Sequence, residues 1–292
     1  MSYGSAQRRT RPTMHQQASG LASATGSHGD ASIDVHGVRK TYKTLDGDVE
    51  AIRDATFRVE SGELVAVVGP SGCGKSTLLK MVAGLIPYDE GSIQVAGVPA
   101  QAANPDVGIM LQSPVLFPWR TVLENVLLPT EVFGMDRTIA VRRANEMLDL
   151  VGLAGFEAKH PWELSGGMQQ RVSLCRLLVF EPSILLMDEP FGSLDEFTRE
   201  RLNSEIAMLQ EQSHRTVLYV THNITEAIFL ADRVVAMSAR PGRVLGIVYS
   251  RLPRPRSLEM LRTETMAQLV GEVRDMLQID HAAPEPRRGD EQ

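Results

Sequence analysis

Apolar residues recur along the chain in two patterns that are typical of β-strands. Apolar and polar positions alternate, as in strands with one solvated face, in SIDVHGV (32–38), ATFRVE (55–60) and SIQVAG (92–97). Unbroken apolar runs that end in glycine or polar residues occur in ELVAVVG (63–69), SILLMDE (183–189) and TVLYVTH (216–222). Because unbroken runs are typical of parallel strands buried on both faces, the pattern predicts a central parallel sheet.

Helical periodicity follows the apolar runs at 75–83, 195–212 and 224–230. Strands that alternate with helices indicate an α/β fold, in which ligands bind at the carboxyl ends of the parallel strands. The alternation stops between about 113 and 180, where the stretches 137–153 and 168–180 are helical. We expect this part to form a helical subdomain inserted in the α/β core.

The two ends of the chain differ from this core. Residues 1–32 are rich in Ser, Gly, Ala, Thr and Gln, and 281–292 also has few apolar residues, so we expect two disordered tails. A transit peptide is the less favoured interpretation of the first tail, because large aliphatic residues are scarce there. Residues 251–280 are expected to be a C-terminal extension with an amphipathic helix at 257–277. Packing on the core, dimer contact and regulation are alternative roles for this helix.

Composition and charge narrow the possible functions. Hydrophobic residues make up 43% of the 292 residues and charged residues 23%, as in ordinary globular proteins. A net charge of −6 argues against a general nucleic-acid binder. Cys73 and Cys175 form neither a disulfide framework nor a metal-ligand cluster, and a reducing, cytosolic setting is the default. No apolar run reaches the roughly 20 residues that cross a bilayer, so work at a membrane requires a span from another chain.

The sequence GPSGCGKST, 69–77, has the pattern G-x-x-x-x-G-K-[ST] of a phosphate-binding loop. It follows a predicted strand and opens a predicted helix, which is the context that such a loop requires. Backbone N–H groups and the helix start can bind phosphate oxygens. Lys75 can reach the β and γ phosphates, and the Ser76 hydroxyl can bind Mg²⁺.

Polar side chains also follow three other predicted strands. Asp188 can hold Mg²⁺ and the adjacent Glu189 can polarise an attacking water, which indicates nucleotide hydrolysis rather than binding alone. His222 ends the next run, and Gln112 ends the strand VGIMLQ. Each of these two is more often structural when it occurs alone. Their position at the same sheet edge as Lys75 favours contact with the γ-phosphate.

These motifs, in this order, resemble those of the ATP-binding subunits of ABC transporters over about residues 33–250. LSGGMQQR is similar to the signature motif of that family and SLDE to its D-loop, while Gln112 and His222 stand at its Q-loop and switch positions. Tyr42 resembles the aromatic residue that stacks on adenine. The resemblance implies a P-loop NTPase of the ABC ATPase fold, with a parallel-sheet core, an antiparallel β portion and an inserted helical subdomain.

The resemblance also implies the residues of the ATP and Mg²⁺ site. Lys75, Gln112, Glu189 and His222 are expected to be catalytic, and Ser76, Gln112 and Asp188 to bind the metal. The residues expected to bind ATP are Tyr42, Gly69, Pro70, Ser71, Gly72, Cys73, Gly74, Lys75, Ser76, Thr77, Ser165, Gly166 and Gly167.

Partners follow from the same resemblance. In the family, two subunits pair head to tail, and the signature motif of one covers the ATP held by the other, so we expect a homodimer or a pair with a different ATPase subunit. SPVLFPWRTVLENVLLP and RLPRPR are similar to the nitrate, sulfonate and taurine branch of importers. That branch implies transmembrane permeases that dock at 112–121, an extracytoplasmic binding protein, and a peripheral position on the cytoplasmic face of the membrane.

Two other classes of protein share parts of this pattern. Soluble ABC ATPases that act on nucleic acid or ribosomes are an alternative, but they carry long coiled coils, extra domains or a second cassette. A GTPase or small-molecule kinase would share the phosphate loop alone. The signature motif and the absence of an Asn-Lys-x-Asp motif disfavour that class.

Overall fold

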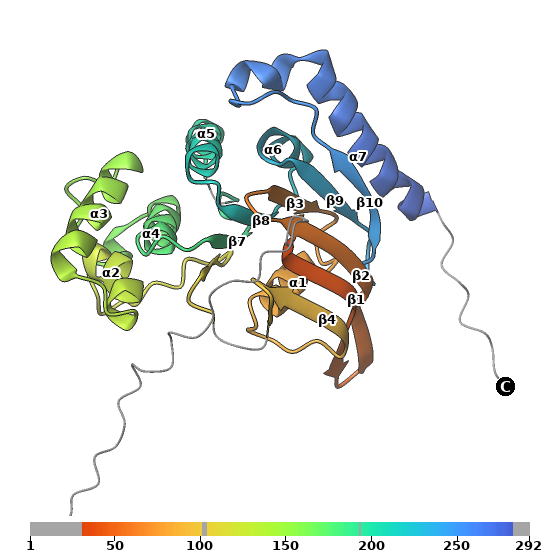
Figure 1. Ribbon diagram of the computed structural model, residues 1–292, viewed down its shortest axis with the longest axis horizontal. Coiled ribbons are helices and arrows are strands. Elements are labelled where there is room, and N and C mark those ends of the chain that lie inside the picture. Colours follow the sequence, from red (N-terminus) through yellow and green to blue (C-terminus); the bar gives the residue numbers. More distant parts are fainter. Residues whose placement is uncertain (1–30, 101–103, 193, 283–292) are drawn as a thin grey trace, which may run out of the picture.

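A six-stranded, mostly parallel sheet forms the centre of the protein (Figure 1). The computed structural model describes residues 31–100, 104–192 and 194–282. The strand order is β10-β9-β3-β8-β7-β6, and only β10 runs antiparallel to its neighbour. The strands are β3 (Leu64–Val68), β6 (Val107–Met110), β7 (Ile184–Asp188), β8 (Thr216–Val220), β9 (Arg233–Met237) and β10 (Val244–Tyr249).

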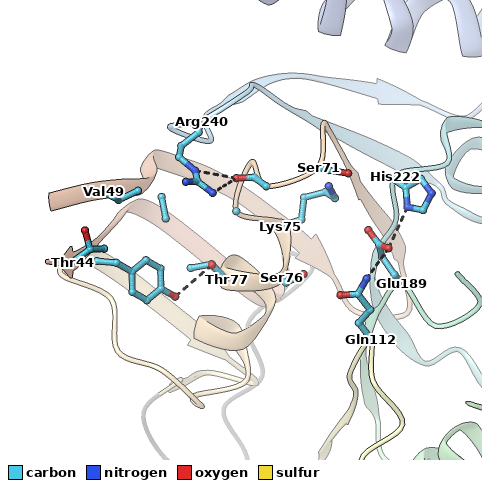
Figure 2. Close-up of a pocket in the computed structure, with 14 residues that line it drawn as sticks. Thr44, Val49, Ser71, Lys75, Ser76, Thr77, Gln112, Glu189, His222 and Arg240 are labelled. Atoms are coloured by element: carbon cyan, nitrogen blue, oxygen red, sulfur yellow. Dashed lines mark hydrogen bonds and ion pairs between the residues drawn. The ribbon is translucent and has the colours of Figure 1, made fainter. Parts of the chain in front are cut away.

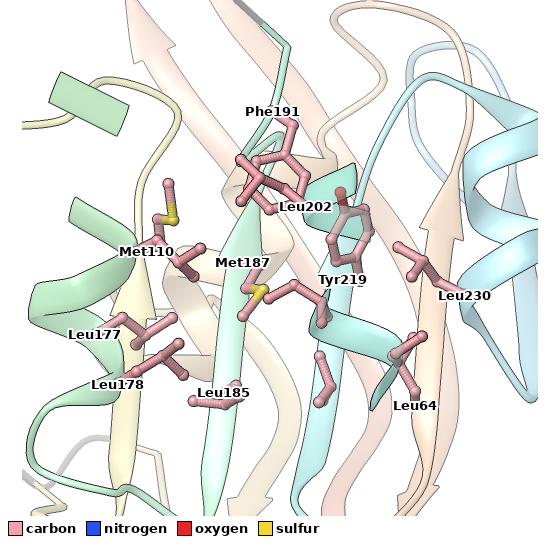
Figure 3. Close-up of a cluster of buried hydrophobic side chains, with 14 of the residues drawn as sticks. Leu64, Met110, Leu177, Leu178, Leu185, Met187, Phe191, Leu202, Tyr219 and Leu230 are labelled. Carbon is pink, nitrogen blue, oxygen red and sulfur yellow. The ribbon is translucent and has the colours of Figure 1, made fainter. Parts of the chain in front are cut away.

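The parallel strands lie between two separate hydrophobic cores. Leu64, Ala66 and Val68 of β3 belong to one core, and Val65 and Val67 belong to the other. Figure 3 shows part of the first core, in which side chains of the sheet meet those of the surrounding helices. Because both faces are dry, neither face needs polar residues, which explains the unbroken apolar runs in the sequence.

An antiparallel sheet with strand order β2-β1-β4-β5 contributes to the second core. Its strands are β1 (Ala31–Thr44), β2 (Gly47–Glu60), β4 (Glu90–Val95) and β5 (Val98–Pro99). In β2, Ala55, Phe57 and Val59 are buried while Thr56 and Arg58 are exposed, as the period-two pattern predicts. Helix α1 (Lys75–Val82) packs between this sheet and the central one.

Three helices, α2 (Val122–Val132), α3 (Arg137–Leu150) and α4 (Gly166–Leu178), pack on one another at the side of the central sheet (Figure 1). They lie within the range 113–180. Helix α2 was not among the predicted helices, because it contains Pro129. It begins at a capping box in which Thr121 and Glu124 bond each other's backbone N–H, which fixes its start.

The C-terminal part of the chain packs against β9, β10 and helix α6 (Ile224–Leu230). The single helix predicted at 257–277 was wrong at its start: the 3-10 helix η2 (Leu258–Arg262) precedes α7 (Glu264–Ala282). Thr263 separates them, with an extended backbone and a side chain that accepts a hydrogen bond from Met266 N–H. The described ranges contain no helix with the length and apolar character of a membrane span. Of the predicted tails at 1–32 and 281–292, residues 31–32 belong to β1 and 281–282 to α7. The other residues of both tails lie outside the described ranges.

The loop between β9 and β10 holds the phosphate loop against β2. Gly242 N–H donates to the Ala51 carbonyl oxygen at 2.9 Å, and its own carbonyl accepts from Arg53 N–H at 2.9 Å. A Cβ atom on Gly242 would lie 2.1 Å from the carbonyl oxygen of Cys73 in the phosphate loop. Only glycine therefore lets the three segments approach this closely.

We expect Gly242→Ala to lower both the thermal stability and the affinity for nucleotide, since the added methyl group displaces the phosphate loop. Overpacking of this kind costs roughly 1–3 kcal/mol. Gly271→Ala in α7 is the matched control: a Cβ there meets no atom within 4 Å, and it should stabilise by roughly 1 kcal/mol. Thermal melts and fluorescent-nucleotide titrations measure both effects. Unchanged binding by Gly242→Ala would contradict the proposed contact.

Candidate functional site

A pocket of about 530 Å³ lies at the carboxyl ends of the parallel strands (Figure 2). Residues from both sheets line it, since the antiparallel sheet closes one side. The predicted residues that meet there are Tyr42, Ser71, Gly72, Gly74, Lys75, Ser76, Thr77, Gln112, Glu189 and His222. Thr44, Val49, Ala51 and Arg240, which the motifs did not indicate, complete the lining.

The phosphate loop joins β3 to α1 and forms the floor of the pocket. Gly72 (φ 76°) and Gly74 (φ 103°) have left-handed backbones that other residues rarely adopt, and Gly74 leads directly into α1. The start of a helix presents N–H groups to an anion. Lys75, only 5% exposed, donates to the carbonyl oxygens of Gly69 (2.8 Å) and Pro70 (3.0 Å). Its ammonium group is thereby held over the loop.

Cys73 contributes to this loop through its backbone. Its side chain is buried and lies near the Lys75 ammonium, with Nζ and Sγ 3.9 Å apart. Burial raises the pKa of the Cys73 thiol. The thiol is therefore protonated at neutral pH and is no candidate nucleophile.

Ser76 and Asp188 form the part of the site suited to a divalent cation. The Ser76 hydroxyl donates to Asp188 Oδ1 at 2.8 Å. Burial raises the pKa of the Asp188 carboxyl, although the Ser76 hydrogen bond opposes this. A hydroxyl and a carboxylate oxygen are ligands that Mg²⁺ takes, together with water and phosphate oxygens. The described residues hold no cluster of three or more His, Cys, Asp or Glu side chains that could bind a metal without such additional ligands.

Glu189 lies at the centre of a second group of polar side chains. Its Oε2 is 3.2 Å from His222 Nδ1 and 3.2 Å from Gln112 Nε2, so both side chains point toward one carboxylate oxygen (Figure 2). Glu189 has φ 44°, which costs a non-glycine residue roughly 1–2 kcal/mol. The backbone N–H of Glu189 donates to the Val220 carbonyl at 2.8 Å, which holds this conformation. The strained backbone places the carboxylate in the pocket.

Gln112 is predicted both as a catalytic residue and as a metal ligand. Its side-chain nitrogen donates to Glu189, and its backbone carbonyl accepts from Gln170 Nε2 of α4 at 3.0 Å. The side chains of Ser173 and Arg176, also on α4, bond the backbone of the following residues of this segment. The segment after β6 is therefore fixed to the helical part. Metal binding by Gln112 stays a prediction.

Tyr42 forms the edge of the pocket on the antiparallel sheet. Its ring is 39% exposed, and its hydroxyl donates to Thr77 Oγ1 at 3.5 Å. Lys40 Nζ lies 5.6 Å from the ring centroid, within range of a cation–π contact. The ring is thus held at the end of the pocket away from Glu189, where a nucleotide base would lie if its phosphates bound the loop.

Gly69, Pro70, Cys73 and Asp188 do not line the pocket but lie in or directly beside the phosphate loop, whereas the predicted signature residues belong to α4. Ser165 caps α4 by accepting a hydrogen bond from Met168 N–H at 3.3 Å, and Gly166 begins the helix. A Cβ on Gly166 would meet no atom within 4 Å, whereas one on Gly167 would lie 2.7 Å from Leu194. Ser165 and Gly166 are exposed, and none of the three lines the pocket.

Arg240 is the main lining residue that sequence reasoning missed. Its Nε and Nη2 both donate to the Gly72 carbonyl oxygen at 3.2 Å, which places a guanidinium group beside the phosphate loop (Figure 2). Ser238 Oγ shapes this loop by donating to the carbonyl oxygens of Ala239 or Pro241 and accepting from Arg243 N–H. The Pro-Gly pair after Arg240 is typical of a turn. It does not indicate that this turn lies beside the phosphate loop.

Comparisons with known proteins agree with this arrangement. The model of a family described as "ABC transporter" matches residues 52–192. The taurine import ATP-binding protein TauB of Escherichia coli K12 is 44% identical over 207 residues, which cover 71% of this chain and 80% of TauB. The aliphatic sulfonates import ATP-binding protein SsuB of Bacillus cereus is 41% identical over 226 residues, 77% of this chain and 89% of SsuB.

Two solved structures of the cassette MJ0796 are also similar. One, described as a dimeric structure of a bacterial ABC transporter cassette, is 32% identical with a TM-score of 0.69 and covers 76% of this chain and all of that one. The other is described as a dimeric post-hydrolysis state bound to ADP and Pi; it is 31% identical, with the same TM-score and coverage.

The raised pKa of Asp188 predicts a pH-dependent effect of Asp188→Asn. The raised pKa means that the charged carboxylate destabilises the nucleotide-free fold, and that this cost grows as pH rises through the folded-state pKa. We expect Asp188→Asn to melt at a higher temperature than the unaltered protein at pH 8. The difference should shrink as pH falls through the raised pKa toward the ordinary pKa of an aspartate.

Asp149→Asn, an exposed site on α3, serves as the control and should show no such trend. A lower melting temperature of Asp188→Asn at pH 8 would contradict the burial argument.

Proposed function

The chain belongs to the ATP-binding proteins of ABC transporters, and we propose that it is the ATPase subunit of an importer for a small solute. The prediction of this family and of its fold is confirmed by the family match and by the cassette structures. The chain is therefore an ABC ATPase. The relatives named for taurine and aliphatic sulfonates support a small sulfonate or a similar oxyanion as the substrate class.

The single observation that carries the proposed chemistry is the convergence of Lys75, Glu189 and His222 on one pocket. In our proposal Lys75 and the loop backbone bind the β and γ phosphates of ATP, and the Tyr42 ring stacks on adenine. Ser76 and Asp188 would hold Mg²⁺, with Gln112 as a further oxygen ligand; when bound, this ion neutralises charge on the phosphates. Their hydroxyl and carboxylate oxygens fit it.

Glu189 is proposed to orient and deprotonate the attacking water. Its carboxylate is held from two sides by His222 and Gln112, at 3.2 Å each, so it can present its free lone pairs to a water in the pocket. His222 can then contact the γ-phosphate, because its side chain is 57% exposed. In this proposal, Lys75 and hydrogen-bond donors from a second copy of the chain stabilise the negative charge on the γ-phosphate.

A second copy of the chain is proposed to supply those donors. Ser165 and Gly166 form an exposed helix start, and the first turn of this helix contains no acidic residue. The similar cassettes are dimeric. A head-to-tail homodimer would place this helix start over the pocket of the partner, which gives two composite ATP sites.

Membrane permeases are the other proposed partners. Val115 and Trp119 are 60% and 70% exposed on the segment that follows Gln112, beside the helical part. We propose that the permeases dock on this segment, that an extracytoplasmic binding protein delivers the solute to them, and that this chain is peripheral at the cytoplasmic face of the membrane. Nucleic acid is not among the proposed partners.

Purification of the tagged protein from detergent-solubilised membranes tests the importer assignment. We expect two copies of this chain with a polytopic permease, and ATP hydrolysis that rises when the loaded binding protein is added. Taurine, alkanesulfonates and nitrate are the first solutes to screen. Recovery without a membrane partner, and with no solute-dependent ATPase activity, would instead favour a non-transport ABC ATPase.

Glu189→Gln should slow ATP hydrolysis by about 10²–10⁴-fold, the usual contribution of a positioned base. The amide keeps the shape of the side chain, so ATP binding should persist and the ATP-bound dimer should accumulate. Turnover assays and size-exclusion chromatography with ATP measure the two effects. Glu146→Gln, which removes an exposed carboxylate on α3, is the control and should behave as the unaltered protein. Normal turnover by Glu189→Gln would refute the role of this residue.

A further inference from the structure

A buried polar cluster includes Thr221, the residue before His222, and does not line the proposed ATP pocket. Its centre is Glu226 of α6, which is 8% exposed. Glu226 Oε1 accepts from Tyr219 OH at 2.9 Å and from Asn203 Nδ2 at 3.1 Å, and Oε2 accepts from Thr221 Oγ1 at 2.5 Å. Among the described residues, Glu226 has no ion pair. Three uncharged donors therefore satisfy the carboxylate.

We propose that Glu226 is a positioning residue for hydrolysis: it fixes the orientation of His222 toward Glu189 and joins the His222 turn to helix α5 (Glu196–Ser213). This inference rests on the proposed ATPase mechanism, and it adds a residue that does not itself reach the pocket.

The turn that carries His222 is closed by hydrogen bonds to Glu226. Thr221 Oγ1 donates to the Glu226 carboxylate and accepts from Asn223 N–H at 3.0 Å. Asn223 Oδ1 in turn accepts from the backbone N–H of Glu226 at 3.1 Å, as the cap of α6. Both neighbours of His222 are thus bonded to one residue. The exposed His222 side chain projects from this bonded turn and contacts Glu189.

The cluster also connects α6 to helix α5. Helix α5 begins at the Asp195 cap, just after the segment that leads away from Glu189. Asn203, 5% exposed on α5, donates to Glu226 Oε1, so α5 and α6 share one carboxylate. The segments after β7 and β8, which carry Glu189 and His222, are therefore joined twice. They meet at the 3.2 Å contact in the pocket and again at the buried cluster.

A purely structural role for Glu226 would predict loss of stability without a selective loss of turnover. Burial of a carboxylate requires such donors in any case, so stability data alone do not separate the two roles. The two roles differ in whether the effect of a Glu226 substitution on kcat depends on the presence of His222. If Glu226 acts through His222, removal of both should cost little more than removal of His222 alone.

The experiment measures kcat and KM for ATP in the single variants Glu226→Gln, Thr221→Val and His222→Ala. It also measures them in two double variants, in which Glu226→Gln or Thr221→Val is combined with His222→Ala. Thr221→Val is close to isosteric and removes both hydrogen bonds of the hydroxyl, the one to Glu226 and the one from Asn223 N–H. We expect kcat to fall about 10-fold or more in Glu226→Gln and Thr221→Val, and KM to change less than about 3-fold, as for an interaction used mainly in the transition state. In the His222→Ala background, the further loss of kcat should be less than about 2-fold.

Gln210→Ala is the matched control. Gln210 is 4% exposed on α5, the helix that carries Asn203. It bonds Gly62 O at 2.6 Å and Arg254 Nη1 at 2.8 Å, on the far side from the pocket. Its loss should lower the melting temperature and leave kcat unchanged. An equal loss of kcat in the Gln210 variant, or full additivity with His222→Ala, would overturn the positioning role.

The unaltered protein separates failure of this inference from failure of the proposed function. If it hydrolyses ATP and His222→Ala does not impair it, the proposed mechanism fails and the role of Glu226 fails with it. If His222→Ala is impaired and the Glu226 and Thr221 variants are not, the mechanism stands and the inference alone is wrong.

Discussion

The register of the parallel strands is the constraint on which the site depends. Asp188 of β7 lies opposite Val220 of β8, and Val220 lies opposite Val67 of β3. The ladder continues one residue further, since Glu189 N–H donates to Val220 O and Thr221 N–H donates to Val67 O. A slip of one residue would turn every side chain to the other face. Such a slip would force both hydrophobic cores to repack. In the observed register, the polar residues beyond the strands emerge together at one edge.

Three buried charged side chains at or near the pocket are stabilised in different ways. Lys75 bonds two carbonyl oxygens, and Asp188 bonds one hydroxyl, so neither has an opposite charge within hydrogen-bonding distance. An uncompensated buried charge costs several kcal/mol. In the proposed ATP complex, the phosphates would supply a negative charge to Lys75 and Mg²⁺ a positive charge to Asp188. Glu226 differs, because three donors of its own chain already satisfy it, and this suits a structural support rather than a ligand contact.

Local residue patterns predict those parts of the site that lie next to one another in sequence. The phosphate loop, Asp188 with Glu189, and His222 each follow a recognisable apolar run, and parallel strands bring such run ends together. Arg240 and Glu226 could not be found in this way. Arg240 reaches Gly72 only because Gly242 permits close packing of a distant loop. Helix α2 contains a proline, and the break at Thr263 depends on a side-chain cap, so their limits were set by tertiary contacts and capping rather than periodicity.

Helix α4 connects the exposed Ser165 cap with the segment that follows β6. Its first residues follow the exposed Ser165 cap, and three side chains further along bond the segment that begins at Gln112. Gln112 in turn donates to Glu189. If anion binding at the start of α4 shifts this helix, as the proposed dimer implies, the bonded Gln112 segment would shift with it. The same segment carries the exposed Trp119. In the proposed assembly, this helix would therefore relate the occupancy of the partner's pocket to the geometry of its own pocket and to the proposed permease surface.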